Sequence, residues 1–422
     1  MPPPVCHSHP LEAAFLSLGD DSAVASPQPS RSLRPAQDGS GAAATTSVFA
    51  MFLEANALSE PLKVLTIDAA TGAQTSRVVK GYDTHGESTR LFEFNRATGM
   101  FVTFENDYSQ PPVGPHGLLP MHMYSVSPSD GAVTKVAVTI SGGARAADDG
   151  WLYPTGYKYD SARRAMVLAT GPTPSGNGPL PPGGFSFHSV DGSGVATKIS
   201  STPGPANSLG LPTDPLAGWI HALSPSGQVS YRFGQYNVSS QSASGAAAGL
   251  GTTNLSDAGS SFSKRTPPPS HAAYLSLDAR EGPAGSTKLY SMAPRSGQAA
   301  TIDLVEWSAN DAVGAQSPPP RVIASLGDAH QPSLFGDIAA TMRGDEWAAL
   351  TVQHPGVILN GGWALSIVAN VSAAAAAAAA AAGDDDVLRT REPAAAVARL
   401  LPLKPRVGGG TCSLSGIGFP ER

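Results

Sequence analysis

Apolar and polar residues alternate in short segments along almost the whole chain. Examples in the first half are "VFAMFLEA" (48–55), "KVLTID" (63–68), "MFVTFEN" (100–106) and "FSFHSV" (185–190). The second half continues with "KLYSMA" (288–293), "ATIDLVEW" (300–307), "EWAALTV" (346–352) and "WALSIVA" (363–369). Alternation with this period is typical of β-strands, and turn-forming residues separate nearly all of the segments. The pattern predicts an all-β protein.

The strands also repeat in groups. "AMFLEANALSEPLKVLTIDAATGAQ" is similar to "AAYLSLDAREGPAGSTKLYSMAPRSGQ", and the blocks 89–141 and 155–201 each contain four strand-like segments. The period is about 60 residues, which suits a ring of stacked four-stranded sheets. We therefore expect a β-propeller of five or six four-stranded blades. The alternative is a β-sandwich, which explains the number of strands but not the repeated pairs of hairpins.

Composition divides the chain into parts. We expect a disordered N-terminus over 1–10 and a propeller over 11–372, with flexible Ser-, Gly- and Pro-rich loops at 19–45 and 236–270. Residues 373–422 are predicted to form an alanine-rich tract and tail. The run Ala373–Ala382 favours helix, although an isolated helix of this length is marginal in water. The segment 394–403 is a candidate for the strand that closes the ring.

The stretch "LTIDAATG" could be a ligand loop or a hairpin turn, because Asp68 stands four residues before Gly72. The corresponding position in the other repeats holds Asn95, Ser127, Asp160, His188 or Ala293. A metal site would not tolerate serine or alanine there. Turns, by contrast, favour short polar side chains followed by glycine. We interpret the motif as a structural turn.

The same stretch resembles the repeats of quinoprotein-type and YVTN-type propellers, in which a pattern like "LxxxDxxTG" recurs. The resemblance implies the propeller fold. It covers about eight residues in each repeat and identifies no specific family. The tryptophan that follows this turn in quinoprotein-type repeats is absent here, since "AQTSRVV" follows Gly72. The resemblance therefore implies no cofactor.

Charge and hydropathy narrow the choice of partners. The net charge is −6 with no basic cluster, which argues against nucleic acid. No apolar run is long enough for a transmembrane helix, and the N-terminus is a poor signal peptide, so a cytoplasmic location is favoured.

Sequons at Asn237, Asn254 and Asn370 leave a secreted glycoprotein as another possibility. Cys6 and Cys412 could pair if the chain ends meet; we interpret them as separate thiols.

Candidate binding residues stand in two polar segments. "YDTHGES" places Asp83 and His85 together, and "GPHGLLPMHM" adds His116 and His122. In a propeller the loops between strands cluster at the rims, where Asp83, His85 and His116 would meet a ligand. No catalytic, metal-binding or cofactor motif is found.

The leading hypothesis is therefore a monomeric binding or scaffold protein, which uses its rim to hold a protein, a small molecule or a carbohydrate. The alternative is a propeller-type hydrolase or lyase with a polar site at the channel mouth. A cluster of histidines and carboxylates at the channel would favour the enzyme, and an apolar or aromatic rim would favour binding.

Overall fold

The computed structural model describes the chain between residues 47 and 419, with gaps. The described residues are 47–54, 62–82, 92–107, 109–111, 119–141, 153–171, 186–201, 222–233, 250–256, 262–265, 276–282, 285–294, 301–309, 321–328, 338–353, 362–382, 398–403 and 412–419. The predictions for 1–10 and 19–45 lie outside these residues, as do Cys6, Asn237 and the question of a disulfide.

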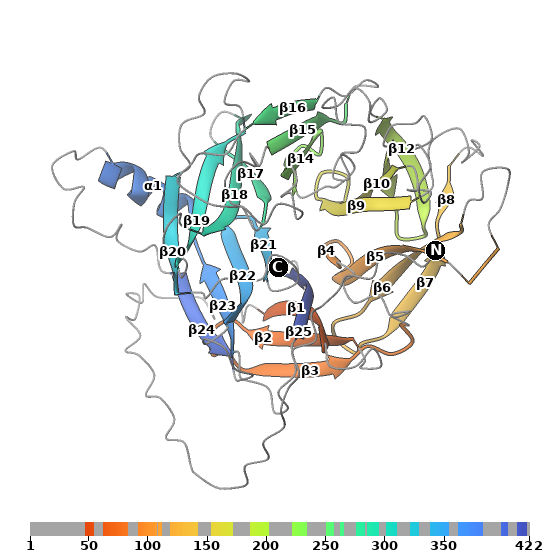
Figure 1. Ribbon diagram of the computed structural model, residues 1–422, viewed down its shortest axis with the longest axis horizontal. Coiled ribbons are helices and arrows are strands. Elements are labelled where there is room, and N and C mark those ends of the chain that lie inside the picture. Colours follow the sequence, from red (N-terminus) through yellow and green to blue (C-terminus); the bar gives the residue numbers. More distant parts are fainter. Residues whose placement is uncertain are drawn as a thin grey trace, which may run out of the picture. The chain divides into compact units, whose positions relative to one another are not determined.

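The described strands form six sheets, and the protein is a six-bladed β-propeller (Figure 1). Blade one contains, from its innermost strand outward, β25 (Cys412–Gly418), β1 (Ser47–Glu54), β2 (Lys63–Asp68) and β3 (Gln74–Val78). Blade two contains β4 (Glu93–Asn95), β5 (Met100–Asn106), β6 (Met121–Val126) and β7 (Val133–Ala137). Blade three contains β9 (Tyr153–Asp160), β10 (Ala165–Gly171), β11 (Ser186–Val190) and β12 (Val195–Ser201), with β8 (Thr139–Ile140) added in parallel to β12.

The other three blades follow the same order. Blade four contains β13 (Ala222–Leu223), β14 (Val229–Phe233), β15 (Leu250–Asn254) and β16 (Phe262–Arg265). Blade five contains β17 (Asp278–Glu281), β18 (Thr287–Pro294), β19 (Thr301–Ser308) and β20 (Arg321–Asp328). Blade six contains β21 (Ile338–Arg343), β22 (Glu346–Gln353), β23 (Gly362–Val368) and β24 (Ala398–Leu403).

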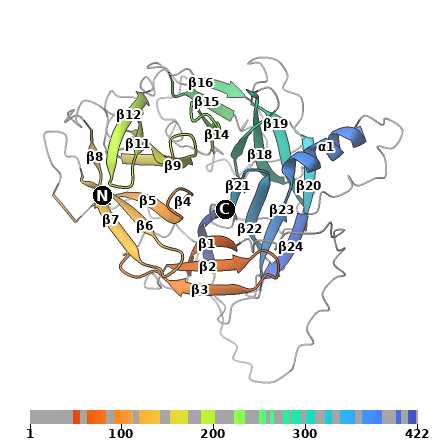
Figure 2. The ribbon, with the colours of Figure 1, turned by 180° about the vertical axis from the view of Figure 1, so that it is seen from behind.

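The ring closes through strands from the two ends of the described chain. β25 pairs antiparallel with β1 and so becomes the innermost strand of blade one. The innermost strands then contact one another in the cyclic order β25, β4, β9, β13, β17, β21 and back to β25. The view from behind shows β4, β9 and β21 around the centre of the ring (Figure 2). The expected closing segment 394–403 instead contains β24, which pairs with β23 at the outer edge of blade six.

Two further strands differ from expectation. β15 and β16 lie within 236–270, which the sequence predicts to be a flexible loop. β15 pairs with β14 over five residue pairs, and Leu255 directly after it is buried. The pairing uses backbone groups, so small residues such as those of "LGTTN" form a strand without an obvious apolar pattern.

Apolar clusters fill the interfaces between neighbouring blades. Between blades one and two, for example, Met51 and Val64 pack with Phe94, Phe101 and Val126. Corresponding clusters join blades two and three, three and four, four and five, five and six, and six and one. Each sheet buries both faces in this way, and burial of apolar area is the main stabilising contribution to the fold.

The structure confirms that the Asp68 motif is a turn. Asp68 Oδ1 accepts hydrogen bonds from Ala70 N at 2.8 Å and Thr71 N at 2.7 Å, and Gly72 has a φ of 74°. In the turn between β4 and β5, Asn95 Oδ1 likewise accepts a hydrogen bond from Ala97 N at 3.1 Å. Asp68 and Asn95 are therefore occupied with the backbone of their own hairpins. His188 and Ala293, which the sequence analysis aligned with them, lie instead within β11 and β18.

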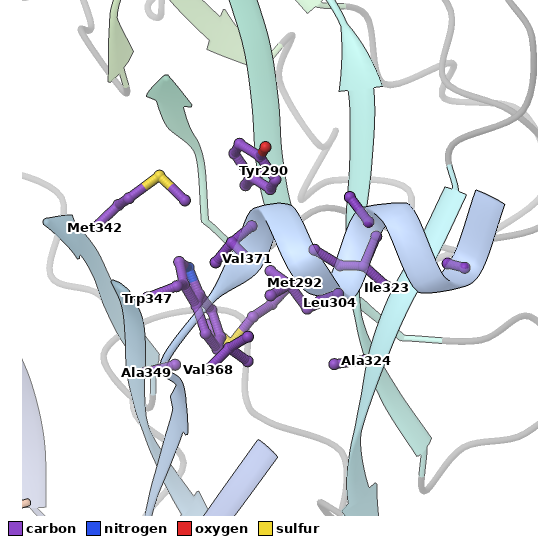
Figure 3. Close-up of a cluster of buried hydrophobic side chains, with 13 residues drawn as sticks. Tyr290, Met292, Leu304, Ile323, Ala324, Met342, Trp347, Ala349, Val368 and Val371 are labelled. Atoms are coloured by element: carbon purple, nitrogen blue, oxygen red, sulfur yellow. The ribbon is translucent and has the colours of Figure 1, made fainter. Parts of the chain in front are cut away.

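The alanine tract forms the helix α1 (Val371–Ala382), between β23 and β24. Buried residues recur along one face at Val371, Ala374, Ala375 and Ala378, and they pack with side chains of blades five and six (Figure 3). Asn370 Oδ1 accepts a hydrogen bond from Ala373 N at 2.7 Å and so caps the helix. Tertiary packing on one face thus supports a helix that would be marginal alone.

The packing of α1 generates the first prediction. Ala374 is 1% exposed, whereas Ala377 lies on the exposed face of the same helix. Ala374→Leu should lower the free energy of unfolding by about 1–3 kcal/mol, because the interface has no room for three further carbons. Ala377→Leu, the matched control, should change it by no more than about 0.5 kcal/mol. Urea unfolding measures both, and equal effects would contradict the packing described.

The closing strand generates the second prediction. A Cβ at Gly418 of β25 would collide with the buried ring of Phe94 in blade two, whereas a Cβ at Gly192 would meet no atom within 4 Å. Gly418→Ala should therefore cost about 1–3 kcal/mol of unfolding free energy, and Gly192→Ala should be nearly neutral. In a Phe94→Ala background, which lacks the ring atoms, Gly418→Ala should cost less unfolding free energy than it does beside Phe94, as measured by urea unfolding of the single and double variants. An equal cost in both backgrounds would place the effect elsewhere.

Candidate functional site

Six side chains that carry charge or hydrogen-bonding groups interact with one another at or beside the innermost strands, and we call them the axis cluster. The axis cluster consists of Glu93, Arg96, Lys158, Asp278, Thr341 and Trp347. Glu93, Lys158 and Thr341 each stand two residues before the last residue of an innermost strand, namely β4, β9 and β21. Equivalent positions in equivalent strands bring these side chains to the same level of the ring.

Arg96 shows that the cluster lies at the ring axis. It belongs to the turn between β4 and β5, which Asn95 and the positive φ of Gly99 hold in shape. Its Nη2 lies 3.4 Å from Thr341 Oγ1 in blade six. Blades two and six are not neighbours, so this contact passes in front of blade one, whose innermost strand is β25. In the part of the chain that is described, no carboxylate forms an ion pair with Arg96.

Glu93 and Lys158 form an ion pair between blades two and three. Lys158 Nζ lies 3.2 Å from Glu93 Oε2, and each side chain keeps 21% of its surface exposed. Burial alone would lower the pKa of Lys158, but the carboxylates of Glu93 and Asp278 outweigh it and hold that pKa above the usual value. The lysine is therefore a fixed positive charge at the axis.

Asp278 and Trp347 are the least satisfied members of the cluster. Asp278 in β17 is 5% exposed and Trp347 in β22 is fully buried. Asp278 Oδ2 and Trp347 Nε1 have no hydrogen-bond partner among the described residues. Trp347 packs beside Met292 and Val368 in the core between blades five and six (Figure 3). Its indole N–H lies close enough to the Asp278 carboxyl to favour the ionised form.

The pKa of Asp278 reflects competing effects. Burial raises it, while the positive charges of Lys158 and Arg96 lower it, and the balance leaves the pKa above that of an ordinary aspartate. A carboxyl of this kind retains its proton to a higher pH than usual, so it can donate a hydrogen bond as well as accept one. The cluster thus combines a fixed cation, a guanidinium, an indole N–H and a carboxyl able to exchange a proton.

A second polar group lies away from the axis, at the end of blade two. His122 Nδ1 is 3.8 Å from Asp107 Oδ2, and Lys135 Nζ is 3.4 Å from the same oxygen. Burial and the nearby Lys135 charge lower the pKa of His122, so its imidazole is neutral at neutral pH. Ser109 donates to Asp107 and lowers the pKa of that carboxyl. The ion pair of Lys135 with Asp107 therefore links β7 to the end of β5.

The candidates from the sequence, Asp83, His85 and His116, lie outside the described residues, so their grouping stays a prediction. Within the described part of the chain, no group of three histidine, cysteine, aspartate or glutamate side chains is arranged to hold a metal ion. None of the described helices has the length and hydropathy needed to span a membrane.

The sequence analysis missed the axis cluster because its members are spread from residue 93 to residue 347. Each belongs to an ordinary strand-and-turn pattern, such as "FEFNRATG" or "YKYDSARR". Three members share a feature that the sequence contains, a charged or polar residue two positions before the end of an innermost strand. This feature can be recognised only when the innermost strand of each blade is known.

Comparisons with known proteins were made at three levels. Neither a protein-family model nor a curated protein matches the chain. Among solved structures, a putative 6-phosphogluconolactonase from Bacteroides fragilis is 8% identical with a TM-score of 0.41, covering 91% of this chain and 100% of that one.

Two other solved structures are similar at the same level. The β-propeller domain of the Trilobed protease from Pyrococcus furiosus is 8% identical with a TM-score of 0.31, covering 72% of this chain and 84% of that one. A mutant of AofleA from Arthrobotrys oligospora is 12% identical with a TM-score of 0.34, covering 89% and 91%. At these values the similarities assign neither a family nor an activity to this chain.

Asp278 generates a prediction about stability and pH. Its pKa is raised above the ordinary aspartate value of 3.8, so the unfolded state releases the proton first as the pH rises. Stability should then fall from about pH 4 until the pH passes the folded-state pKa. Asp278→Asn removes this loss, so its stability relative to the wild type should increase over that interval and then level off.

Asp130 provides the control, because Ser127 and the Ala132 N–H lower the pKa of its exposed carboxyl. Asp130→Asn should therefore be neutral or slightly destabilising at neutral pH, which is the opposite sign. Urea unfolding of the three proteins at each pH unit between about 4 and 8 gives the comparison. A difference between Asp278→Asn and wild type that did not change with pH would contradict the raised pKa.

Proposed function

We propose that the protein binds a small polar molecule at the ring axis, on the axis cluster. The observation that carries this proposal is the pair of buried, unpartnered groups, Asp278 Oδ2 and Trp347 Nε1. Neither atom makes a hydrogen bond of ordinary geometry, which costs up to about 1–3 kcal/mol for each buried group, and the interaction of the indole N–H with the carboxyl offsets only part of this cost. A ligand that bonds to both would remove the rest of this cost on binding.

The neighbouring charges support the same site. Glu93 and Lys158 are each 21% exposed although they belong to innermost strands, so water reaches the axis at their level. Binding sites commonly combine a concave, largely apolar setting with a few convergent polar groups. Here Trp347 and the core beside it provide apolar surface, and the rest of the axis cluster provides the polar groups.

The sequence analysis expects a binding protein that uses its rim, through Asp83, His85 and His116. The proposal keeps binding as the function and moves the site to the axis, because the axis cluster rests on contacts and burial. A rim site for a protein partner is compatible with it, since the two sites would use different residues.

A hydrolase or lyase at the same cluster is the second candidate. One observation favours it: the pKa of Asp278 is raised, as expected for a residue that supplies a proton to a substrate. An enzyme would turn over the ligand that the cluster binds, whereas a binding protein would release it unchanged. Chromatography of the bound and released compound distinguishes the two.

The proposal can be tested by thermal shift with four groups of small compounds: polyols, hydroxy acids, sugar phosphates and amines. At least one group should raise the melting temperature of the wild type, and Trp347→Phe should abolish the increase because it removes the indole N–H. Trp307→Phe, on β19 of blade five, is the matched control and should retain it. The absence of any increase, or increases that survive Trp347→Phe unchanged, would refute a ligand site at the axis.

A further inference from the structure

We propose that the ligand of the axis cluster is a small carboxylate monoanion, held by Arg96 and taken up together with one proton that Asp278 binds. This inference rests on the binding function proposed above and specifies the chemical class of the ligand.

The first argument is the balance of charge. Glu93 and Lys158 neutralise each other through their ion pair at 3.2 Å. Arg96 is left with one contact, the hydroxyl of Thr341 at 3.4 Å, in the described part of the chain. When Asp278 carries a proton the cluster has one net positive charge, which a monoanion neutralises. A phosphate dianion would leave one excess negative charge on the cluster.

The second argument is the chemistry of the hydrogen-bonding groups. The guanidinium of Arg96 and the indole of Trp347 can only donate, so both require an acceptor. Trp347 Nε1 is fully buried, and the Asp278 carboxyl beside it does not accept a hydrogen bond of ordinary geometry from it. The guanidinium presents a planar set of donors that matches the two oxygens of a carboxylate. A ligand carboxylate would therefore satisfy Arg96 and accept from Trp347 or Asp278.

The third argument concerns the proton. Arg96 and Lys158 act electrostatically on Asp278, so an anion bound to Arg96 would also lie near the Asp278 carboxyl. A ligand carboxylate there would act on Asp278 in the same direction as Glu93, by raising its pKa further and so favouring uptake of a proton. The pKa of Asp278 is already raised, so Asp278 takes it. The ligand anion and one proton enter, no covalent bond changes, and neutral Asp278 donates its O–H to the ligand.

The other polar groups around Asp278 are engaged with partners of their own. Tyr290, its partner on β18, donates to Glu306 Oε2 at 2.9 Å, and burial keeps the pKa of this phenol well above the range considered. Arg280, on the same strand β17, binds Asp345. The charged groups that act on Asp278 are those of Glu93 on β4, Lys158 on β9 and Arg96 in the turn after β4. Arg343 on β21 pairs with Glu346.

Calorimetric titrations with paired acids and amides test the inference. Glycolate and gluconate are compared with glycolamide and gluconamide, which have the same size but no charge. The acids should bind at least about tenfold more tightly than the amides, since a charge-assisted bond replaces a neutral one. Arg96→Gln should weaken acid binding by about tenfold or more, and Arg96→Lys should recover only part of it. Arg77→Gln, on outer strand β3, removes the same charge and should leave the affinity within about twofold.

The pH dependence tests the proton. Between about pH 5 and 8 the affinity for the acids should fall as the pH rises, by up to about tenfold per unit above the pKa of Asp278. Titrations in buffers of different ionisation enthalpy should show uptake of up to one proton per ligand. Asp278→Asn should still bind the acids, with no dependence on pH and no proton uptake.

The outcomes separate this inference from the binding function. If amides bind as tightly as acids and Arg96→Gln has no effect, while Trp347→Phe abolishes binding, the axis site stands and the carboxylate inference is wrong. If acids bind through Arg96 with no proton uptake, the role given to Asp278 is wrong. If no acid or amide binds, the inference fails, and the compound screen with Trp347→Phe decides the axis site separately.

Discussion

The pairing of β25 with β1 is the constraint on which the rest of the structure depends. It joins the two ends of the described chain by backbone hydrogen bonds and makes the last strand the innermost strand of the first blade. It also places blades two and six on either side of β25, which contacts both β4 and β21. Arg96 and Thr341 come from those two flanking blades, so the closing strand sets the distance across which their contact forms. The geometry at the axis therefore depends on closure of the ring.

Stability and function are distributed differently over the molecule. The interfaces between blades are filled by apolar side chains, and their burial contributes most of the favourable free energy. The axis holds ionised and unpartnered groups, which oppose folding. Neither Asp278 nor Trp347 improves the packing of the ring through its polar atoms. The ring stays closed despite the unfavourable free energy of these buried polar groups, because each blade packs against a neighbour on both of its faces.

The parts of the structure that sequence predicts are those determined locally. Alternation identified most strands, and the Asp68 motif was correctly interpreted as a turn because its own repeats supply the comparison. The closing strand was missed, since "CSLSGIG" has few large apolar residues and its pairing with β1 is made by backbone groups. β15 was not predicted either, because "LGTTN" also has few large apolar residues. The axis cluster requires knowledge of which strands are innermost, and that follows from the closure of the ring.

The helix α1 shows what a uniform side chain does to register. After Val371, every residue of α1 is serine or alanine, so each rotation of the helix presents nearly the same surface of methyl groups to blades five and six. The position of the helix is defined at its first turn, by the Asn370 cap and by the bond from Ser372 N to Asp345 Oδ1 at 2.9 Å. Gain or loss of one alanine farther along would leave the packed face chemically unchanged. The alanine tract can therefore vary in length without altering the interface that it covers.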